Sequence, residues 1–236
     1  MRERPRILIT EHAEGRAEGV SELVEEAGAQ AKVVRLFQKI DGLDSYEYDA
    51  VIATGGPMGI YEMDKPEYQF LKKEADYLSA MIAKNRAVLG ICLGHQLLAH
   101  VLGGQIEFSP QNAEVGWTEI ILNNDGEKDL LFLNMPDEFW SFEYHSDRVV
   151  SPPPGTLNLA SSKHCDVQAF RKPNSLIWGV QFHPEISSEK AKRILEARRE
   201  ALEQRGIDVM LAVNQGFSVS HEPRKQIFVN FVNALK

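Results

Sequence analysis

The residues with the clearest capacity for covalent chemistry lie between positions 88 and 96, where an apolar run leads into Gly90, Cys92 and Gly94. A cysteine with glycines two positions away on both sides, between a strand and a helix, is typical of the sharp turn that presents a nucleophile. The glycines let strand and helix approach closely, and the N-terminus of the helix favours negative charge beside it. An isolated cysteine is otherwise a small buried side chain; the two glycines favour the nucleophile.

A thiol nucleophile in acyl transfer needs a base, and the base needs a group that orients it. Among the seven histidines, His183 follows an apolar run at 177–182 and is separated from Glu185 by one proline. Sites of doubly wound sheets assemble at the carboxyl ends of strands, so we expect His183 as the base and Glu185 as its orienting carboxylate, rather than a surface turn. His95 is the alternative base, but on the helix that leaves the turn it should point away from the thiol and be structural.

The elements that must position these residues alternate through the first half of the chain. Strands are predicted at 6–10, 32–36, 49–54 and 87–91, and helices at 13–27, 66–84 and 93–102. This order predicts a parallel sheet with helices on both faces. Further strands are predicted at 105–108, 115–122, 139–144, 157–161, 167–170 and 177–182, and further helices at 188–204 and 225–235.

The predicted fold is therefore α/β, an open, mostly parallel, doubly wound (flavodoxin-like) sheet that the later strands extend with an antiparallel layer at one edge. We expect a single domain over 1–236, in which 186–236 form a helical C-terminal extension and a final helix. No internal repeat or composition shift divides the sequence.

Composition excludes several classes of function. The 236 residues carry 26 Lys and Arg against 34 Asp and Glu, a net charge of -8, which argues against nucleic-acid and membrane-surface binding. Basic residues at 192, 193, 198 and 199 alternate with glutamates and predict a solvated helix face. Two cysteines, Cys92 and Cys165, exclude a disulfide scaffold and a paired-cysteine zinc site. Without a membrane-length apolar run or a leader, a cytoplasmic location is expected.

Four stretches together resemble the class I, triad-type glutamine amidotransferases. They lie at 54–57, at 90–96 with two glycines at 103–104, at 143–147 and at 179–185. The resemblance is closest to the glutaminase domain of GMP synthase and its stand-alone relatives. It implies that Cys92 attacks the side-chain amide of glutamine and that His183, oriented by Glu185, protonates the departing ammonia. It implies no cofactor and no metal.

The same resemblance implies the remaining site residues. The backbone N–H groups of Gly56 and Leu93 would hold the oxyanion, and the substrate would be bound by Gly55, Gln96, Tyr144, His145 and Ser146. The stretch at 58–61 departs from the family pattern, and no phosphate-binding loop of the form G-x-x-x-x-G-K-[ST] is present. Activation of a nucleotide acceptor would therefore need a separate synthase.

Three functions follow as hypotheses. The first is a glutaminase that forms a γ-glutamyl thioester on Cys92 and releases glutamate and ammonia, for a separate synthase. The second is a stand-alone γ-glutamyl peptidase or hydrolase, which shares the acyl-enzyme but releases an amine from a γ-glutamyl compound. The third is a non-catalytic regulatory binding module on the same fold.

Overall fold

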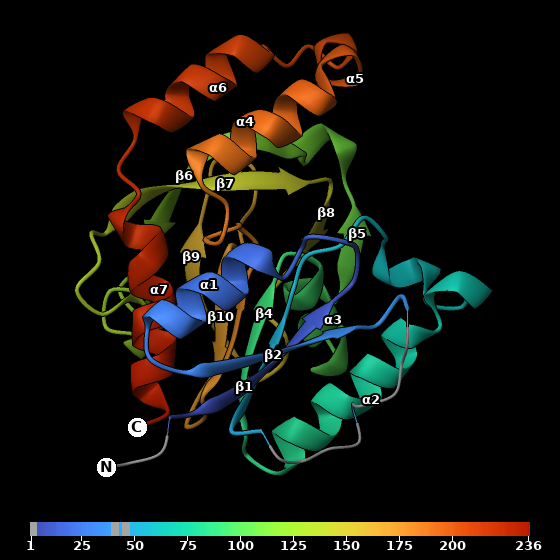
Figure 1. The fold of residues 1–236 in the computed structure, drawn as a ribbon, viewed down its shortest axis with the longest axis vertical. Helices are drawn as coiled ribbons and strands as arrows, with labels where there is room; N and C mark the ends of the chain where they lie inside the picture. The colour runs from blue at the N-terminus through green and yellow to red at the C-terminus, as the bar shows by residue number, and fades with distance from the viewer. Residues whose placement is uncertain (1–3, 39–42, 44–47) are drawn as a thin grey trace.

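A nine-stranded sheet forms the centre of the computed structural model, which describes residues 4–38, 43 and 48–236 (Figure 1). Five neighbouring strands are parallel, as predicted. In sheet order they are β2 (Gln30–Arg35), β1 (Arg6–Glu11), β3 (Ala50–Ala53), β4 (Ala87–Ile91) and β11 (Ile177–Val180).

Antiparallel strands continue this sheet beyond β11, which confirms the predicted antiparallel layer. In order they are β10 (Ala169–Lys172), β9 (Leu157–Ser161), β6 (Glu114–Leu122) and β7 (Glu138–His145). The expectation that residues 105–108 extend the same sheet is wrong. β5 (Ile106–Phe108) instead pairs with β8 (Asp147–Val149), a strand that the sequence did not predict, in a separate two-stranded sheet.

Each face of the parallel part is covered by two helices (Figure 1). Ile7 and Ile9 of β1 pack into one apolar cluster and Leu8 into the other, because successive side chains of a strand point to opposite faces. Each fully buried aliphatic side chain contributes roughly 1.5–3 kcal/mol. The first cluster includes side chains of α1 (Glu18–Glu26) and α7 (Glu222–Ala234), and the second those of α2 (Phe70–Ala83) and α3 (Leu93–Val101).

Three helices of the C-terminal region lie over β6 and β7 (Figure 1). The single helix predicted at 188–204 is wrong, because the chain turns at Arg198 (φ -119°, ψ 14°). Leu195 and Leu202, before and after this turn, are both buried against Trp117 and Phe142. Neither Gly nor Pro marks the turn, so it has no local signal. The helices are α4 (Ser188–Ala197), α5 (Arg199–Gln204) and α6 (Val209–Ser218), the last one unpredicted.

The remaining elements are short 3-10 helices. They are η1 (Ile60–Glu62), η2 (Pro66–Tyr68), η3 (Pro110–Asn112) and η4 (Leu130–Phe132). The predicted helix at 66–84 thus begins as η2 before α2, and the one predicted at 13–27 begins only at Glu18, which leaves residues 13–17 in a loop. Among the described residues, no helix combines the length and the apolar character needed to cross a bilayer.

Candidate active site

Cys92 occupies a strained turn between β4 and α3. Its backbone has φ 52° and ψ -105°, a conformation that few non-glycine residues adopt. The glycines act as predicted: a Cβ on Gly90 would lie 2.4 Å from the carbonyl oxygen of Gly94, and one on Gly94 would lie 2.1 Å from that of Ala53. Strand and helix can therefore meet at this angle only because both side chains are absent.

His183 and Glu185 lie just beyond the end of β11 and form a buried pair. Nδ1 of His183 is 2.7 Å from Oε1 of Glu185, and both residues are 4% exposed. Burial by itself would lower the pKa of His183, but the Glu185 carboxylate and the Cys92 side chain outweigh it and raise that pKa well above its ordinary value. Burial would likewise raise the pKa of Glu185, and the imidazole outweighs it and lowers that pKa.

The loop after β3 packs against both reactive side chains. A Cβ on Gly55 would lie 2.8 Å from Cε1 of His183 and 3.6 Å from Cβ of Cys92. One on Gly56 would lie 2.6 Å from a methyl carbon of Leu93. Only glycine fits at such approaches, so the loop brings the backbone of Gly56 and of Leu93 to the same side of Cys92.

A buried polar network supports this loop from beneath. The hydroxyl of Thr54 lies 3.4 Å from Nδ1 of His12, and Nε2 of His12 contacts the carboxylate of Glu74 on α2. Thr10 of β1 donates to the same carboxylate. These bonds join two strands and a helix below the loop, which restricts its movement.

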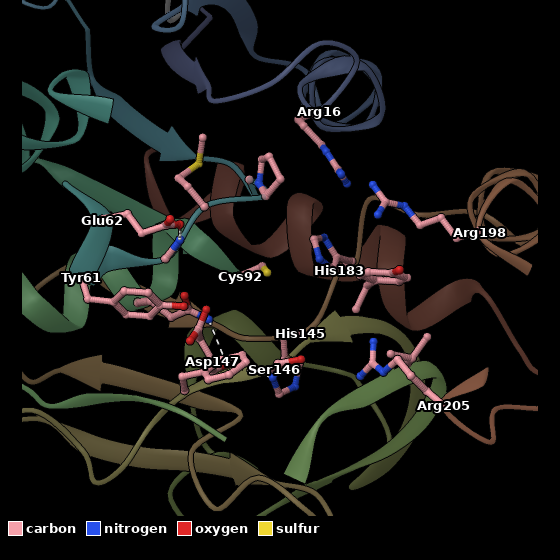
Figure 2. Close-up of a pocket in the computed structure, with 18 residues that line it drawn as sticks. Arg16, Tyr61, Glu62, Cys92, His145, Ser146, Asp147, His183, Arg198 and Arg205 are labelled. Atoms are coloured by element: carbon pink, nitrogen blue, oxygen red, sulfur yellow. Dashed lines mark hydrogen bonds between the residues drawn. The ribbon is translucent and has the colours of Figure 1, made fainter. Parts of the chain in front are cut away.

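A cavity of about 260 Å³ opens above Cys92 (Figure 2). The structure brings most of the predicted residues together around it: Gly56, Cys92, Gln96, Tyr144, His145, Ser146 and His183. The other three, Gly55, Leu93 and Glu185, lie behind this lining, where Gly55 contacts His183 and Cys92, Leu93 contacts Gly56, and Glu185 contacts His183.

Two of the predicted binding residues are held by the protein itself. Nε2 of Gln96 donates to the carbonyl oxygen of Asp147 at 3.0 Å and to Oε1 of Gln181 at 3.1 Å, so the amide oxygen is the group left for a ligand. His145 contacts the carbonyl oxygen of Asp147 through Nδ1 and Glu114 through Nε2. Its side chain thus holds the turn at 144–147 in place, and that turn faces a ligand mainly with its backbone.

Several lining residues were missed by sequence reasoning. They are Arg16, Tyr61, Glu62, Asp147 and Arg205, together with Arg198 (Figure 2). The expectation of a solvated helix face is wrong for Arg198, because the turn between α4 and α5 places it at the cavity. Asp147 lies within the motif at 143–147 and could have been found; the arginines carry no local signal.

His95 and Cys165 lie apart from the cavity lining. The His95 ring is fully buried 4.9 Å from that of Phe170, and burial lowers its pKa to about 3, so it is neutral. This confirms the structural role expected for it. The thiol of Cys165 donates to the carbonyl oxygen of Val167 at 3.6 Å, and burial raises its pKa.

Among the described residues, one group has the composition of a metal site: Glu114, Glu143 and His145. Nε2 of His145 lies 3.1 Å from Glu114 and 3.4 Å from Glu143. Glu114 also accepts from Ser162 and Gln168, at 2.7 Å each. These hydrogen bonds already account for the buried Glu114 carboxylate, so the group fits a polar network.

The arrangement of thiol, imidazole and carboxylate at the carboxyl ends of parallel strands is that of the cysteine-nucleophile hydrolases that work by acyl transfer. The model of the family described as glutamine amidotransferase class-I matches residues 14–201, and the chain belongs to this family. The resemblance drawn from the four sequence stretches is therefore confirmed.

Curated relatives and a solved structure agree with this assignment. One of the two kinds of subunit named for the glutamine-hydrolyzing GMP synthase of Sulfolobus acidocaldarius is 38% identical over 141 residues, 59% of this chain and 69% of that protein. The glutamine-hydrolyzing GMP synthase of Pyrobaculum aerophilum is 33% identical over 191 residues, 80% of this chain and 34% of that protein. The crystal structure of a glutamine amidotransferase from Thermotoga maritima is 27% identical with a TM-score of 0.85 and covers 99% of both chains.

Proposed function

We propose that this protein hydrolyses the side-chain amide of glutamine to glutamate and ammonia. The observation that carries the proposal is the placement of Cys92, on a strained turn, beside a histidine whose Nδ1 is 2.7 Å from Glu185. Since Nδ1 faces a carboxylate, Nε2 is the nitrogen that can exchange a proton with the thiol and the substrate.

In the proposed reaction the Cys92 sulfur bonds to the amide carbon, and the negative oxygen that forms accepts hydrogen bonds from the backbone N–H groups of Gly56 and Leu93. His183 transfers its proton to the amide nitrogen, the carbon–nitrogen bond breaks, and ammonia leaves. Water then attacks the γ-glutamyl thioester with His183 as the base, which frees glutamate and restores the thiol. Gln96 and the turn at 144–146 hold the amino-acid end of the substrate.

A separate synthase protein is the proposed consumer of the ammonia. Support comes from the Sulfolobus acidocaldarius relative, whose name is that of one subunit of a GMP synthase, and from the Pyrobaculum aerophilum synthase, of which the matched part is about a third. We also propose that residues 1–236 act as one domain, in which the helices from α4 to α7 form an extension after the site.

The test is to incubate the purified chain with glutamine and measure glutamate and ammonia, with and without a glutamine-like electrophile. We expect equal release of both products, complete inhibition by the electrophile, and a single adduct on the peptide that contains Cys92. An adduct on Cys165, with Cys92 unlabelled and activity retained, contradicts the proposal.

A further inference from the structure

Three arginines from separate parts of the chain converge on the cavity above Cys92. Arg16 comes from the loop between β1 and α1, Arg198 from the turn between α4 and α5, and Arg205 from the residue after α5. Figure 2 shows them on the His183 side, across from Tyr61, Glu62 and Asp147. The cavity is therefore polarised, with cations on one side and carboxylates on the other.

These arginines have no carboxylate partner within ion-pair distance in the described part of the chain. Arg198 lies over the ring of Tyr144, 5.5 Å from its centre, a contact that orients the guanidinium and leaves its charge uncompensated. By contrast, Arg199, next in the chain, pairs with Glu203 at 3.2 Å. Gathering cations without counter-ions costs free energy through their repulsion, which a bound anion would relieve.

The space on this side continues beyond the catalytic cavity. A second cavity of about 560 Å³ lies along α5 and shares Tyr144, Arg198 and Arg205 with the first. It extends away from Cys92 toward Leu202 and Gln204. A substrate bonded at Cys92 could therefore place an additional group there.

His183 decides which part of a substrate faces the arginines. In the proposed reaction it protonates the nitrogen that leaves, so the leaving amine lies on the His183 side. Ammonia from glutamine has nothing to offer these cations. An amine that carries a carboxylate would have its anion near two or three guanidinium groups, whose planar donors match a carboxylate.

We propose that this site accepts γ-glutamyl compounds whose leaving amine carries an anionic group, such as γ-glutamyl amino acids, with Arg16, Arg198 and Arg205 as the residues that recognise the anion. The inference rests on the proposed chemistry at Cys92. The sulfur bonds to the γ-carbonyl carbon, the carbon–nitrogen bond breaks, His183 gives its proton to the leaving amine, and water then cleaves the thioester to glutamate.

The test separates recognition from turnover by using the Cys92→Ala variant for binding. Calorimetry compares γ-glutamylglycine with γ-glutamylglycinamide, two ligands that differ in the charge of the leaving group. We expect the acid to bind at least about tenfold more tightly, since a charge-assisted pair contributes about 1.4 kcal/mol or more. Adding Arg198→Gln or Arg205→Gln should reduce the preference below threefold. Adding Arg199→Gln, the matched control, should leave it unchanged.

Equal binding of acid and amide, or binding of neither, overturns the inference. So does an equal loss of both ligands and of glutamine in the arginine variants, because the arginines would then hold the α-carboxylate common to all three. Glutamine hydrolysis by the unmodified chain is measured in parallel. A charge preference without hydrolysis of glutamine or γ-glutamylglycine contradicts the proposed reaction alone, whereas glutamine hydrolysis without a charge preference contradicts the anion site alone.

Discussion

The two cysteines occupy regions that burial alone does not distinguish. Cys92 is 6% exposed and Cys165 is 0% exposed, and both are free thiols. Cys92 lies on a turn with positive φ, beside His183, at the floor of a cavity. Cys165 lies between β9 and β10 and donates to a backbone carbonyl, and its neighbour Ser162 bonds to Glu114.

The comparison teaches that a thiol's chemistry depends on what surrounds it and on where it opens. Near Cys165, burial and the carboxyl group of Glu143 disfavour a thiolate and raise the pKa. Near Cys92, an imidazole that can take up a proton faces the sulfur, and a helix begins at the next residue. Reactivity is thus a property of the turn and of its partner.

The largest expected effect is on Cys92. Cys92→Ala should lower glutamine hydrolysis by roughly 10⁴-fold or more, because no other thiol faces the cavity among its lining residues. Ammonia release measures the activity, and thermal unfolding serves as the folding control. Activity within tenfold of the unmodified protein shows that the nucleophile lies elsewhere.

A smaller loss is expected at the carboxylate behind the base. Glu185→Gln keeps the size of the side chain but removes the charge that holds His183 protonated at Nδ1, so kcat should fall by roughly 10²–10⁴-fold with a smaller change in KM. The pH profile should also move, with the limb due to His183 displaced to lower pH since its pKa is no longer raised by a carboxylate. An unchanged pH profile contradicts the orienting role.

Glu143 links the two regions, since its charge acts on Cys165 and that of Cys92 acts on it. Burial, and then Glu114, raise its pKa well above the ordinary value, so the folded protein keeps a proton that the unfolded chain loses near pH 4–5. The free energy of unfolding therefore falls as pH rises from that ordinary value toward the raised one.

Glu143→Gln mimics the protonated side chain and removes this dependence. Relative to the unmodified protein, its stability should rise with pH through the same window by up to about 1.4 kcal/mol for each pH unit, and the difference should level off near pH 4. Urea unfolding between pH 4 and pH 8 measures both proteins. Parallel stability curves mean that Glu143 titrates at its ordinary pKa.

The smallest effect is expected at the other thiol. Cys165→Ala should leave kcat/KM for glutamine within about twofold and cost about 1 kcal/mol of stability, because only a buried sulfur and its weak hydrogen bond are lost. Chemical denaturation and ammonia release measure the two quantities. A loss of activity comparable to that of Cys92→Ala would erase the distinction between the two regions.

Much of this site could be predicted because its signals are local. Gly90 and Gly94 indicated the turn at Cys92, and the apolar runs at 87–91 and 157–161 match β4 and β9 residue for residue. The pairing of His183 with Glu185 could also be predicted, since one proline separates them. In these cases neighbours in the chain are also neighbours in space.

The sequence by itself thus determined the parallel sheet, the strained turn and the residues that the resemblance connects with it. Only the tertiary structure decided that β5 pairs with β8, that the helix after Ser187 turns at Arg198, and that Arg16 and Arg205 reach the same cavity. These features depend on packing and charge between segments far apart in the chain, for which neither periodicity nor Gly and Pro provides a local signal.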